Sequence, residues 1–183
     1  MRIYKDKIAL LAAVFASGII LVAIMAPLIS PYDPLSIDLD SLRMPPSLQH
    51  LLGTDNKGRD VLSRIMYGAR ISLSVSVIAT FVSMTIGLAL GLISGYIGGK
   101  VDAVITVLID IVMAFPSLLL AIGISAVLPP GLYTVIIALG VVGWASFARL
   151  MRGTVLTIKG LPYVESARAL GCSGYRVALW HIL

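Results

Sequence analysis

Long apolar stretches alternate with short polar segments along this chain. Uncharged runs cover residues 8–29, 71–97 and 132–148, and a fourth apolar run, 103–128, contains one carboxylate. About 20 apolar residues, at about 1.5 Å each, cross a hydrocarbon core roughly 30 Å thick. The pattern therefore predicts an all-α, polytopic membrane helix bundle with four spans in this sequence.

The first apolar run has two interpretations, a cleaved signal peptide or a membrane anchor. The apolar region of a signal peptide is about 7–15 residues long. Residues 8–29 form a longer run, and they end in Pro27–Pro31 without an obvious small-residue cleavage site. The sequence favours an uncleaved signal-anchor helix.

Residues 30–70 are polar and rich in proline, which predicts an aqueous segment rather than a span. Thr54 or Asp55 is a suitable cap for a helix in its second part. The apolar positions that follow fall on one helical face. We expect a short helix that lies on the membrane surface. Its apolar face consists of Val61, Leu62, Ile65, Met66 and Ala69.

Small residues recur every fourth position in the second apolar run. Four residues are close to one helical turn, so these positions form one stripe, along which another helix can approach closely. Scattered membrane glycines are the alternative, but five consecutive positions favour a packing stripe. The stripe consists of Ala79, Ser83, Gly87, Gly91 and Gly95.

The third run follows a turn at residues 98–102 and contains both Asp110 and Pro116. A carboxylate in a membrane span usually faces protein or water, and a proline kinks the helix that contains it. Asp110 and Pro116 are therefore candidate residues of a translocation pathway or gate. For Asp110, the alternative is a polar anchor bonded to a neighbouring helix. The sequence favours the anchor. Pro129–Gly131 then separates the third run from the fourth.

The charge distribution predicts the orientation of the chain. Only 13% of the residues are charged and 58% are hydrophobic, whereas soluble domains carry about 25% charged residues. Basic residues dominate the N-terminal tail and the region after residue 148, whereas residues 30–70 are balanced. The positive-inside rule places both basic regions in the cytoplasm and residues 30–70 outside. The net charge of +5 thus sets topology and does not indicate nucleic-acid binding.

No motif for catalysis or for a bound cofactor is present in the sequence. Residues 94–101, SGYIGGKV, fail as a phosphate-binding loop because Ser94 replaces the first glycine and Val101 the final Ser or Thr. One cysteine and two histidines provide no metal-ligand cluster. We expect neither an enzyme nor a cofactor, so any work driven by ATP requires a partner that hydrolyses it.

The C-terminal stretch predicts two short helices joined by a turn. Pro162 suits the first turn of a helix, and Gly171 permits a sharp stop. Glu165 and Arg168 lie three residues apart and can pair. A second helix is expected from about Ser173. Such a hairpin suits docking into a groove of another protein, and an ordinary cytoplasmic connector is the alternative.

The same stretch resembles the EAA loop of ABC-importer permeases, in which E-A-A-x-x-x-G precedes I-x-L-P. Glu165, Ala167 and Gly171 match in register, and Ser166 replaces the middle alanine. Leu183 falls on the leucine, and His181 replaces the isoleucine. Further segments resemble the dipeptide, oligopeptide and nickel permeases of this family. They are residues 53–55, 58–64, 67–70, 115–121 and 144–152.

The resemblance implies a permease subunit in the bacterial inner membrane that moves peptides or nickel. Its expected partners are a second permease subunit, two cytoplasmic ATP-binding-cassette ATPases, an extracytoplasmic substrate-binding protein and membrane lipid. The EAA match assigns ATPase coupling to Glu165, Ser166, Ala167 and Gly171. Residues 1–70 then form an N-terminal segment, and residues 71–183 form part of a type-1 transmembrane domain.

Family members normally have six spans, and two of them follow the EAA loop. This sequence ends within that loop, which predicts either a fragment or a truncated product. Two other function classes remain open at this point. A truncated permease would bind partners without transporting, and a membrane enzyme would need a polar catalytic cluster, for which the apolar runs offer only Asp110.

Overall fold

The structure is a computed structural model that describes residues 7–178 and 180. The predictions for the basic tail at residues 2 and 5, and for His181 and Leu183, lie outside this part. All named elements within it are helical, as the sequence predicted. Two compact units are present, Met1–Ser74 and Val75–Leu183.

Helix α1, Lys7–Ile29, is the first predicted span. Its 23 residues are apolar and long enough to cross a membrane. Most of its large side chains are exposed, and only the small residues Ala23 and Ala26 are buried. An exposed apolar surface of this length is what a lipid-facing helix presents.

Residues 30–60 form a folded loop that contains the short 3-10 helix η2, Leu39–Ser41. Gly53 and Gly58 adopt left-handed φ angles of 74° and 73°. A Cβ atom at Gly58 would overlap the carbonyl of Asp38, and one at Gly53 would overlap the carbonyl of Met44. Glycine at both positions therefore lets separate segments of the loop lie in close contact.

Helix α2, Val61–Ile97, corrects the prediction of a separate surface helix that begins near residue 54. The helix begins at Val61 and continues without a break through the second predicted span. Thr54 and Asp55 lie before it, because their side chains bond elsewhere: Thr54 donates to the carbonyl of Ser41, and Asp55 accepts from Lys57 and Arg59. Asp60 caps the helix instead, by accepting from the Ser63 backbone N–H at 2.8 Å.

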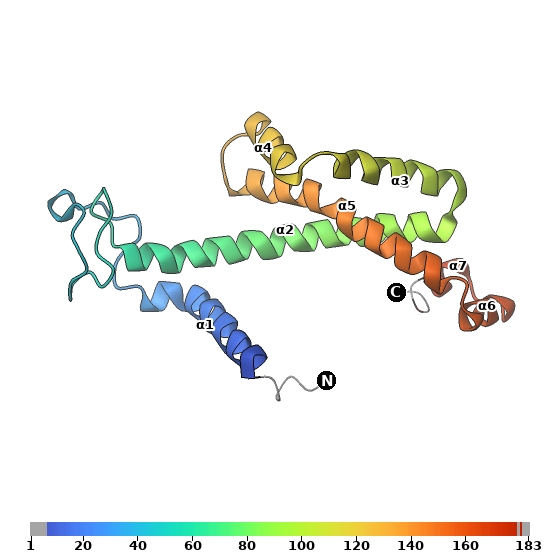
Figure 1. The fold of residues 1–183 in the computed structure, drawn as a ribbon, viewed down its shortest axis with the longest axis horizontal. Helices are drawn as coiled ribbons and strands as arrows, with labels where there is room; N and C mark the ends of the chain where they lie inside the picture. The colour runs from blue at the N-terminus through green and yellow to red at the C-terminus, as the bar shows by residue number, and fades with distance from the viewer. Residues whose placement is uncertain (1–6, 179, 181–183) are drawn as a thin grey trace. The chain divides into compact units, whose positions relative to one another are not determined.

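The second unit is organised around α2 and α5, Leu132–Ile158. Ser83 on α2 lies against Gly140 on α5, and Gly95, further along α2, lies against Val155. Residue numbers rise together on both helices, so the two helices run in the same direction (Figure 1). A parallel pair requires the chain to return between them.

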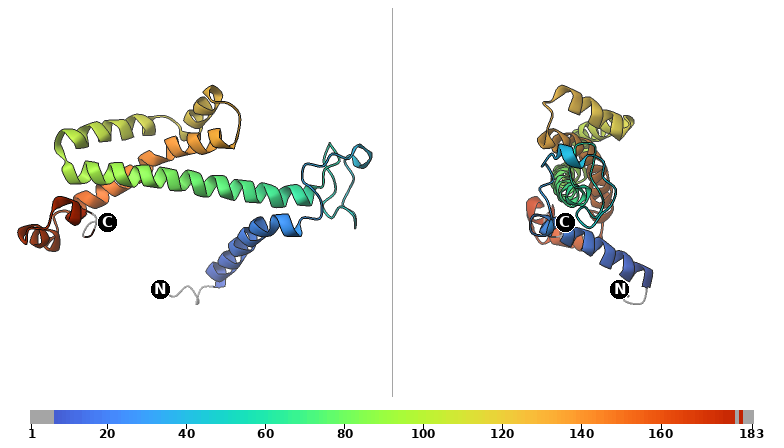
Figure 2. Two further views of the ribbon diagram at one scale, coloured as in Figure 1. Left: turned by 180° about the vertical axis from the view of Figure 1, so that it is seen from behind. Right: turned by 90° about the vertical axis from the view of Figure 1, so that its left-hand side faces the viewer.

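Helices α3, Gly99–Ala114, and α4, Ser117–Val127, make this return. They are bent by 90° at the break around Pro116, so the predicted kink is a complete interruption of the helix. Both α3 and α4 contact α5 (Figure 2). Because α2 and α5 are parallel, we count the broken pair as one crossing. The described part of the chain then has four candidate crossings.

The fourth predicted span ends at Ala148, but α5 continues for ten more residues. The predicted turn at residues 98–102 is shorter than expected. Only Gly98, with a φ of 73°, lies outside a helix there, and α3 begins at Gly99. Two short helices end the described chain, α6, Pro162–Ala169, and α7, Gly174–Val177.

Candidate functional site

The hairpin formed by α6 and α7 follows from local sequence signals. Pro162 occupies the first turn of α6, where its missing N–H costs no intrahelical bond. Gly171 adopts a φ of 83° after the helix, and its N–H donates to the Arg168 carbonyl at 2.9 Å. Ser173 precedes α7 as its N-cap residue. The short turn brings the two helices into contact.

Helix α6 has one buried face and one exposed face. Val164 and Ala167 are buried in a core cluster together with Met151 and Val155 of α5 and Val177 of α7. Glu165 and Ser166 are exposed on the other face, and the Ser166 hydroxyl donates to the Pro162 carbonyl at 2.8 Å.

The four candidate coupling residues therefore differ in their positions. Glu165 and Ser166 are available to a partner, whereas Ala167 packs inside this chain, and Gly171 forms the turn.

In the described structure, no ion pair joins Arg168 to Glu165, although their spacing in the sequence would allow one. The guanidinium carbon of Arg168 lies 5.3 Å from the centroid of the Tyr96 ring, at the end of α2. This distance is typical of a cation–π contact.

The stripe of small residues on α2 faces α5. A Cβ atom at Gly87 would lie 2.6 Å from the Trp144 carbonyl oxygen, and one at Gly91 would lie 2.5 Å from that of Ala148. Ser83 belongs to the same contact and donates its hydroxyl to the Gly140 carbonyl at 3.1 Å. Gly95 completes the stripe, where an added Cβ would lie 2.7 Å from Val155 Cβ. At the three glycines, the two backbones thus approach too closely for a side chain on α2.

Polar side chains join α2, α3 and α5 at the end of the bundle that carries α6. Arg152 donates from Nε and Nη2 to the two oxygens of Asp102, at 2.6 and 2.7 Å. Ser94 also donates to Asp102, at 2.5 Å. Lys159 Nζ donates to the Gly95 carbonyl at 2.9 Å. These bonds fix the ends of the three helices relative to one another.

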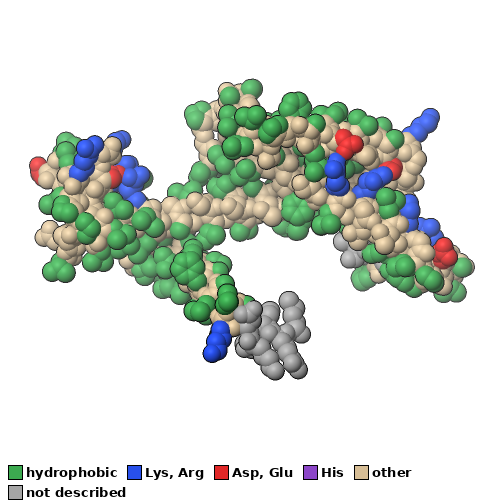
Figure 3. Space-filling view, in the orientation of Figure 1, with side chains coloured by type: hydrophobic (Ala, Val, Ile, Leu, Met, Phe, Trp, Pro, Cys, Tyr) green, Lys and Arg blue, Asp and Glu red, His purple; other side chains and the backbone are tan. Residues whose placement is uncertain are grey.

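Asp110 forms an ion pair with Arg149 of α5, at 2.5 Å, and both side chains are more than half exposed. An ion pair to a neighbouring helix is the kind of bond that the polar-anchor interpretation of Asp110 expects. Charged side chains gather over α3 and α5 in the space-filling view, among hydrophobic ones (Figure 3). Pro116, the other candidate pathway residue, lies exposed at the break before α4.

An ionic cluster stabilises the loop in the first unit. Asp55 binds Arg59 at 2.7 Å and also Arg64. Burial raises the pKa of Asp55, but hydrogen bonds from Arg59 and from the backbone outweigh it and hold the pKa well below its usual value. The same balance of burial against bonds from Ser63 and His50 lowers the pKa of Asp60. Both carboxylates therefore stay charged near neutral pH.

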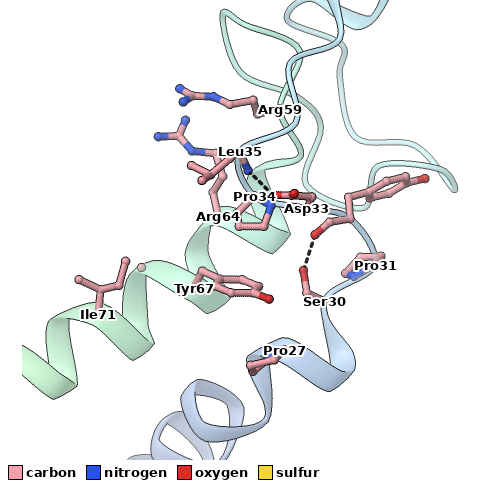
Figure 4. A pocket seen from close by; sticks show the side chains of 12 residues that line it. Pro27, Ser30, Pro31, Asp33, Pro34, Leu35, Arg59, Arg64, Tyr67 and Ile71 are labelled. Atoms are coloured by element: carbon pink, nitrogen blue, oxygen red, sulfur yellow. Dashed lines mark hydrogen bonds between the residues drawn. The ribbon is translucent and has the colours of Figure 1, made fainter.

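An open pocket of about 690 Å³ lies beside this cluster. In Figure 4, Arg59 and Arg64 extend in the same direction, and Tyr67 points toward Ser30. Asp33 also lines the pocket. Both arginines of the pocket pair with Asp55.

The sequence interpretation missed Asp102, Arg152 and Tyr96. Asp102 lies in the predicted turn and Arg152 in the basic region after residue 148, and a separation of 50 positions gave no reason to join them. A charge close to a predicted span is the one signal that marked them, since such charges usually find a partner. In the described residues, no group of three or more His, Cys, Asp or Glu side chains could hold a metal ion.

Glycine-packed spans, a broken crossing and a helical hairpin define a multi-pass helical membrane protein. The chain belongs to the family of binding-protein-dependent transport system inner membrane components, which matches residues 87–183. Residues 1–46 match the N-terminal TM domain of oligopeptide transport permease C. These matches establish an inner-membrane protein and confirm the predicted resemblance.

Curated relatives align with the whole chain. It is 45% identical over 183 residues to the glutathione transport system permease protein GsiD of Shigella dysenteriae serotype 1. It is 46% identical to the proteins of the same name from Shigella flexneri serotype 5b and Salmonella typhimurium. The chain spans 60% of the length of each relative. These relatives are transport permeases rather than enzymes, in agreement with the expectation of a non-enzyme.

Proposed function

We propose that the chain is a permease subunit of an ATP-binding-cassette importer and that α6 docks on a cytoplasmic ATPase subunit. The exposed Glu165–Ser166 face of α6 carries the proposal. Val164 and Ala167 fix the opposite face in the core, so a partner that binds the exposed face binds a helix already held in place. Preorganisation of this kind lowers the entropic cost of binding.

Further parts of the proposal follow from the family and the relatives. The other subunits are a second permease, two ATPases and an extracytoplasmic binding protein. Substrates of the peptide class are favoured over nickel, because the relatives are named for glutathione transport. Residues 1–70 form the N-terminal segment, and residues 71–183 belong to the transmembrane domain that forms the pathway.

We expect the charge reversal Glu165→Lys to abolish retention of the ATPase. The complete gene product would be expressed with its neighbouring ATPase, permease and binding-protein genes and purified from membranes. Asp40→Lys is the matched control, since it reverses an exposed acid in the loop of residues 30–60. Equal retention of the ATPase by the native protein and by Glu165→Lys would contradict docking through this face.

A non-transporting interaction partner is the second candidate function. It makes the same prediction for ATPase retention, because the exposed face of α6 is unchanged. Uptake of a labelled tripeptide into proteoliposomes separates the two candidates, since only the permease gives uptake that depends on ATP and on the binding protein.

The proposed orientation places the N-terminus and α6 in the cytoplasm and residues 30–70 outside. Cysteine labelling tests it in a Cys172→Ser background. In right-side-out membranes, an impermeant maleimide should label Asp40→Cys, and it should label Tyr175→Cys only after the membrane is opened. Both positions are exposed, so accessibility reports the side of the membrane. The reverse labelling pattern would invert the assigned topology.

A further inference from the structure

Tyr96 occupies the last turn of α2, next to the hairpin of α6 and α7. Its side chain is half-buried and packs against the core cluster that contains Val155, Val164 and Val177. The cluster is apolar, and the phenol ring of Tyr96 extends it. Tyr96 thus lies where α2, α5, α6 and α7 meet.

The ring of Tyr96 contacts both helices of the hairpin. On α6, the guanidinium carbon of Arg168 lies 5.3 Å from the ring centroid. On α7, a Cβ atom at Gly174 would lie 3.1 Å from the Tyr96 hydroxyl oxygen. A glycine at the start of α7 therefore allows the phenol to approach its backbone. The Tyr96 side chain on α2 thus contacts the end of α6 and the start of α7.

The residues beside Tyr96 connect the same turn of α2 to α5. Lys159, the C-cap residue of α5, donates from Nζ to the Gly95 carbonyl at 2.9 Å. An added Cβ at Gly95 would lie 2.7 Å from Val155 Cβ. The last turn of α2 is therefore firmly fixed to α5, whereas its connection to α6 runs through the core cluster and through the Tyr96–Arg168 contact.

We propose that Tyr96 is a positioning residue that joins the hairpin to α2 through Arg168. A displacement of α6 by its partner then moves the end of α2 and, through Gly95, the end of α5. The inference rests on the proposed docking of an ATPase on α6. The cation–π contact requires the aromatic ring, and the hydroxyl group contributes little to it.

The test uses the complete transporter in proteoliposomes with its binding protein and a tripeptide substrate. ATPase retention, basal ATP hydrolysis and its stimulation by the loaded binding protein are measured for Tyr96→Leu, Arg168→Gln and the double variant. Each single variant should retain the ATPase, because Val164 and Ala167 still hold α6. The ratio of stimulated to basal hydrolysis should fall about two- to fivefold, the factor expected for one cation–π contact.

Two further variants distinguish positioning from a general loss of stability. Tyr96→Phe keeps the ring and should preserve stimulation. Arg176→Gln removes an exposed arginine from α7 and should have no effect. The double variant should be no worse than either single variant, because both remove the same contact.

Several results would overturn the inference. They are normal stimulation in Tyr96→Leu and Arg168→Gln, additive losses in the double variant, a Tyr96→Phe loss equal to that of Tyr96→Leu, and loss of the ATPase from either single variant. Failure of the native protein to retain the ATPase would instead reject the proposed function, and the inference with it. Arg168→Gln changes an exposed side chain, so it keeps the test decisive if Tyr96→Leu does not fold.

Discussion

Gly87→Ala is expected to destabilise the protein strongly, although glycine-to-alanine changes inside a helix are usually stabilising by about 1 kcal/mol. The added Cβ would lie 2.5 Å from Phe147 Cβ, 2.6 Å from the Trp144 carbonyl oxygen and 2.9 Å from the Ala148 nitrogen. Two of these atoms belong to the backbone, so no change of rotamer relieves the overlap. The helices α2 and α5 must separate, at a cost of about 1–3 kcal/mol.

Two other glycines on α5 make the experiment a graded series. Gly140→Ala places its Cβ 3.2 Å from a Val82 side-chain carbon, and Gly153→Ala has no atom within 4 Å. Thermal unfolding of the purified protein in detergent should therefore rank Gly87→Ala lowest, Gly140→Ala next, and Gly153→Ala at or above the native protein. Equal melting temperatures for Gly87→Ala and Gly153→Ala would show that α2 and α5 do not pack as described.

Removal of the Asp102 carboxylate should have the second-largest effect. Asp102→Asn removes the charge that accepts two bonds from Arg152 and one from Ser94. It leaves the arginine without a counter-charge between the helices. Loss of one partner from a buried ion pair costs about 3–5 kcal/mol. The Asp102 and Arg152 side chains are 20% and 30% exposed, so we expect a smaller loss, about 2 kcal/mol.

The combination of Asp102→Asn with Arg152→Gln identifies the cause of this loss. The double variant has no unpaired charge, so it should be more stable than the sum of the single losses predicts, and close to the better single variant. Chemical denaturation of the purified protein in mixed micelles supplies the comparison. Strictly additive losses would mean that the two side chains act independently, contrary to the bidentate geometry.

Features that repeat along the chain could be predicted from the sequence. The apolar runs gave the first span and the two parallel helices, because length and hydropathy decide whether a helix can cross a bilayer. The stripe of Ser83, Gly87, Gly91 and Gly95 has a four-residue period, so one helical face was evident before its partner was known. Pro162 and Gly171 are local signals, and their positions in the hairpin agree with the structure.

Features that depend on competing or distant partners could not be predicted in the same way. Thr54 and Asp55 have the residue types of helix caps, but their side chains form hydrogen bonds within the folded loop instead. The position of Asp102 near a turn concealed its bond to a residue 50 positions later. Ala167 belongs to the docking motif, and its small side chain is also buried in the core cluster of this chain. Partners that lie far apart in the sequence, such as Asp102 and Arg152, are not recognisable as partners from the sequence alone.

The break between α3 and α4 has a consequence for whatever surrounds it. A helix of 16 residues rises about 24 Å, short of a hydrocarbon core roughly 30 Å thick. About four carbonyls at the end of one helix and about four N–H groups at the start of the next lack intrahelical partners, and no side chain caps the start of α4. Acyl chains offer no hydrogen bonds to these groups. Water or a neighbouring protein must therefore reach the break and supply the missing hydrogen bonds.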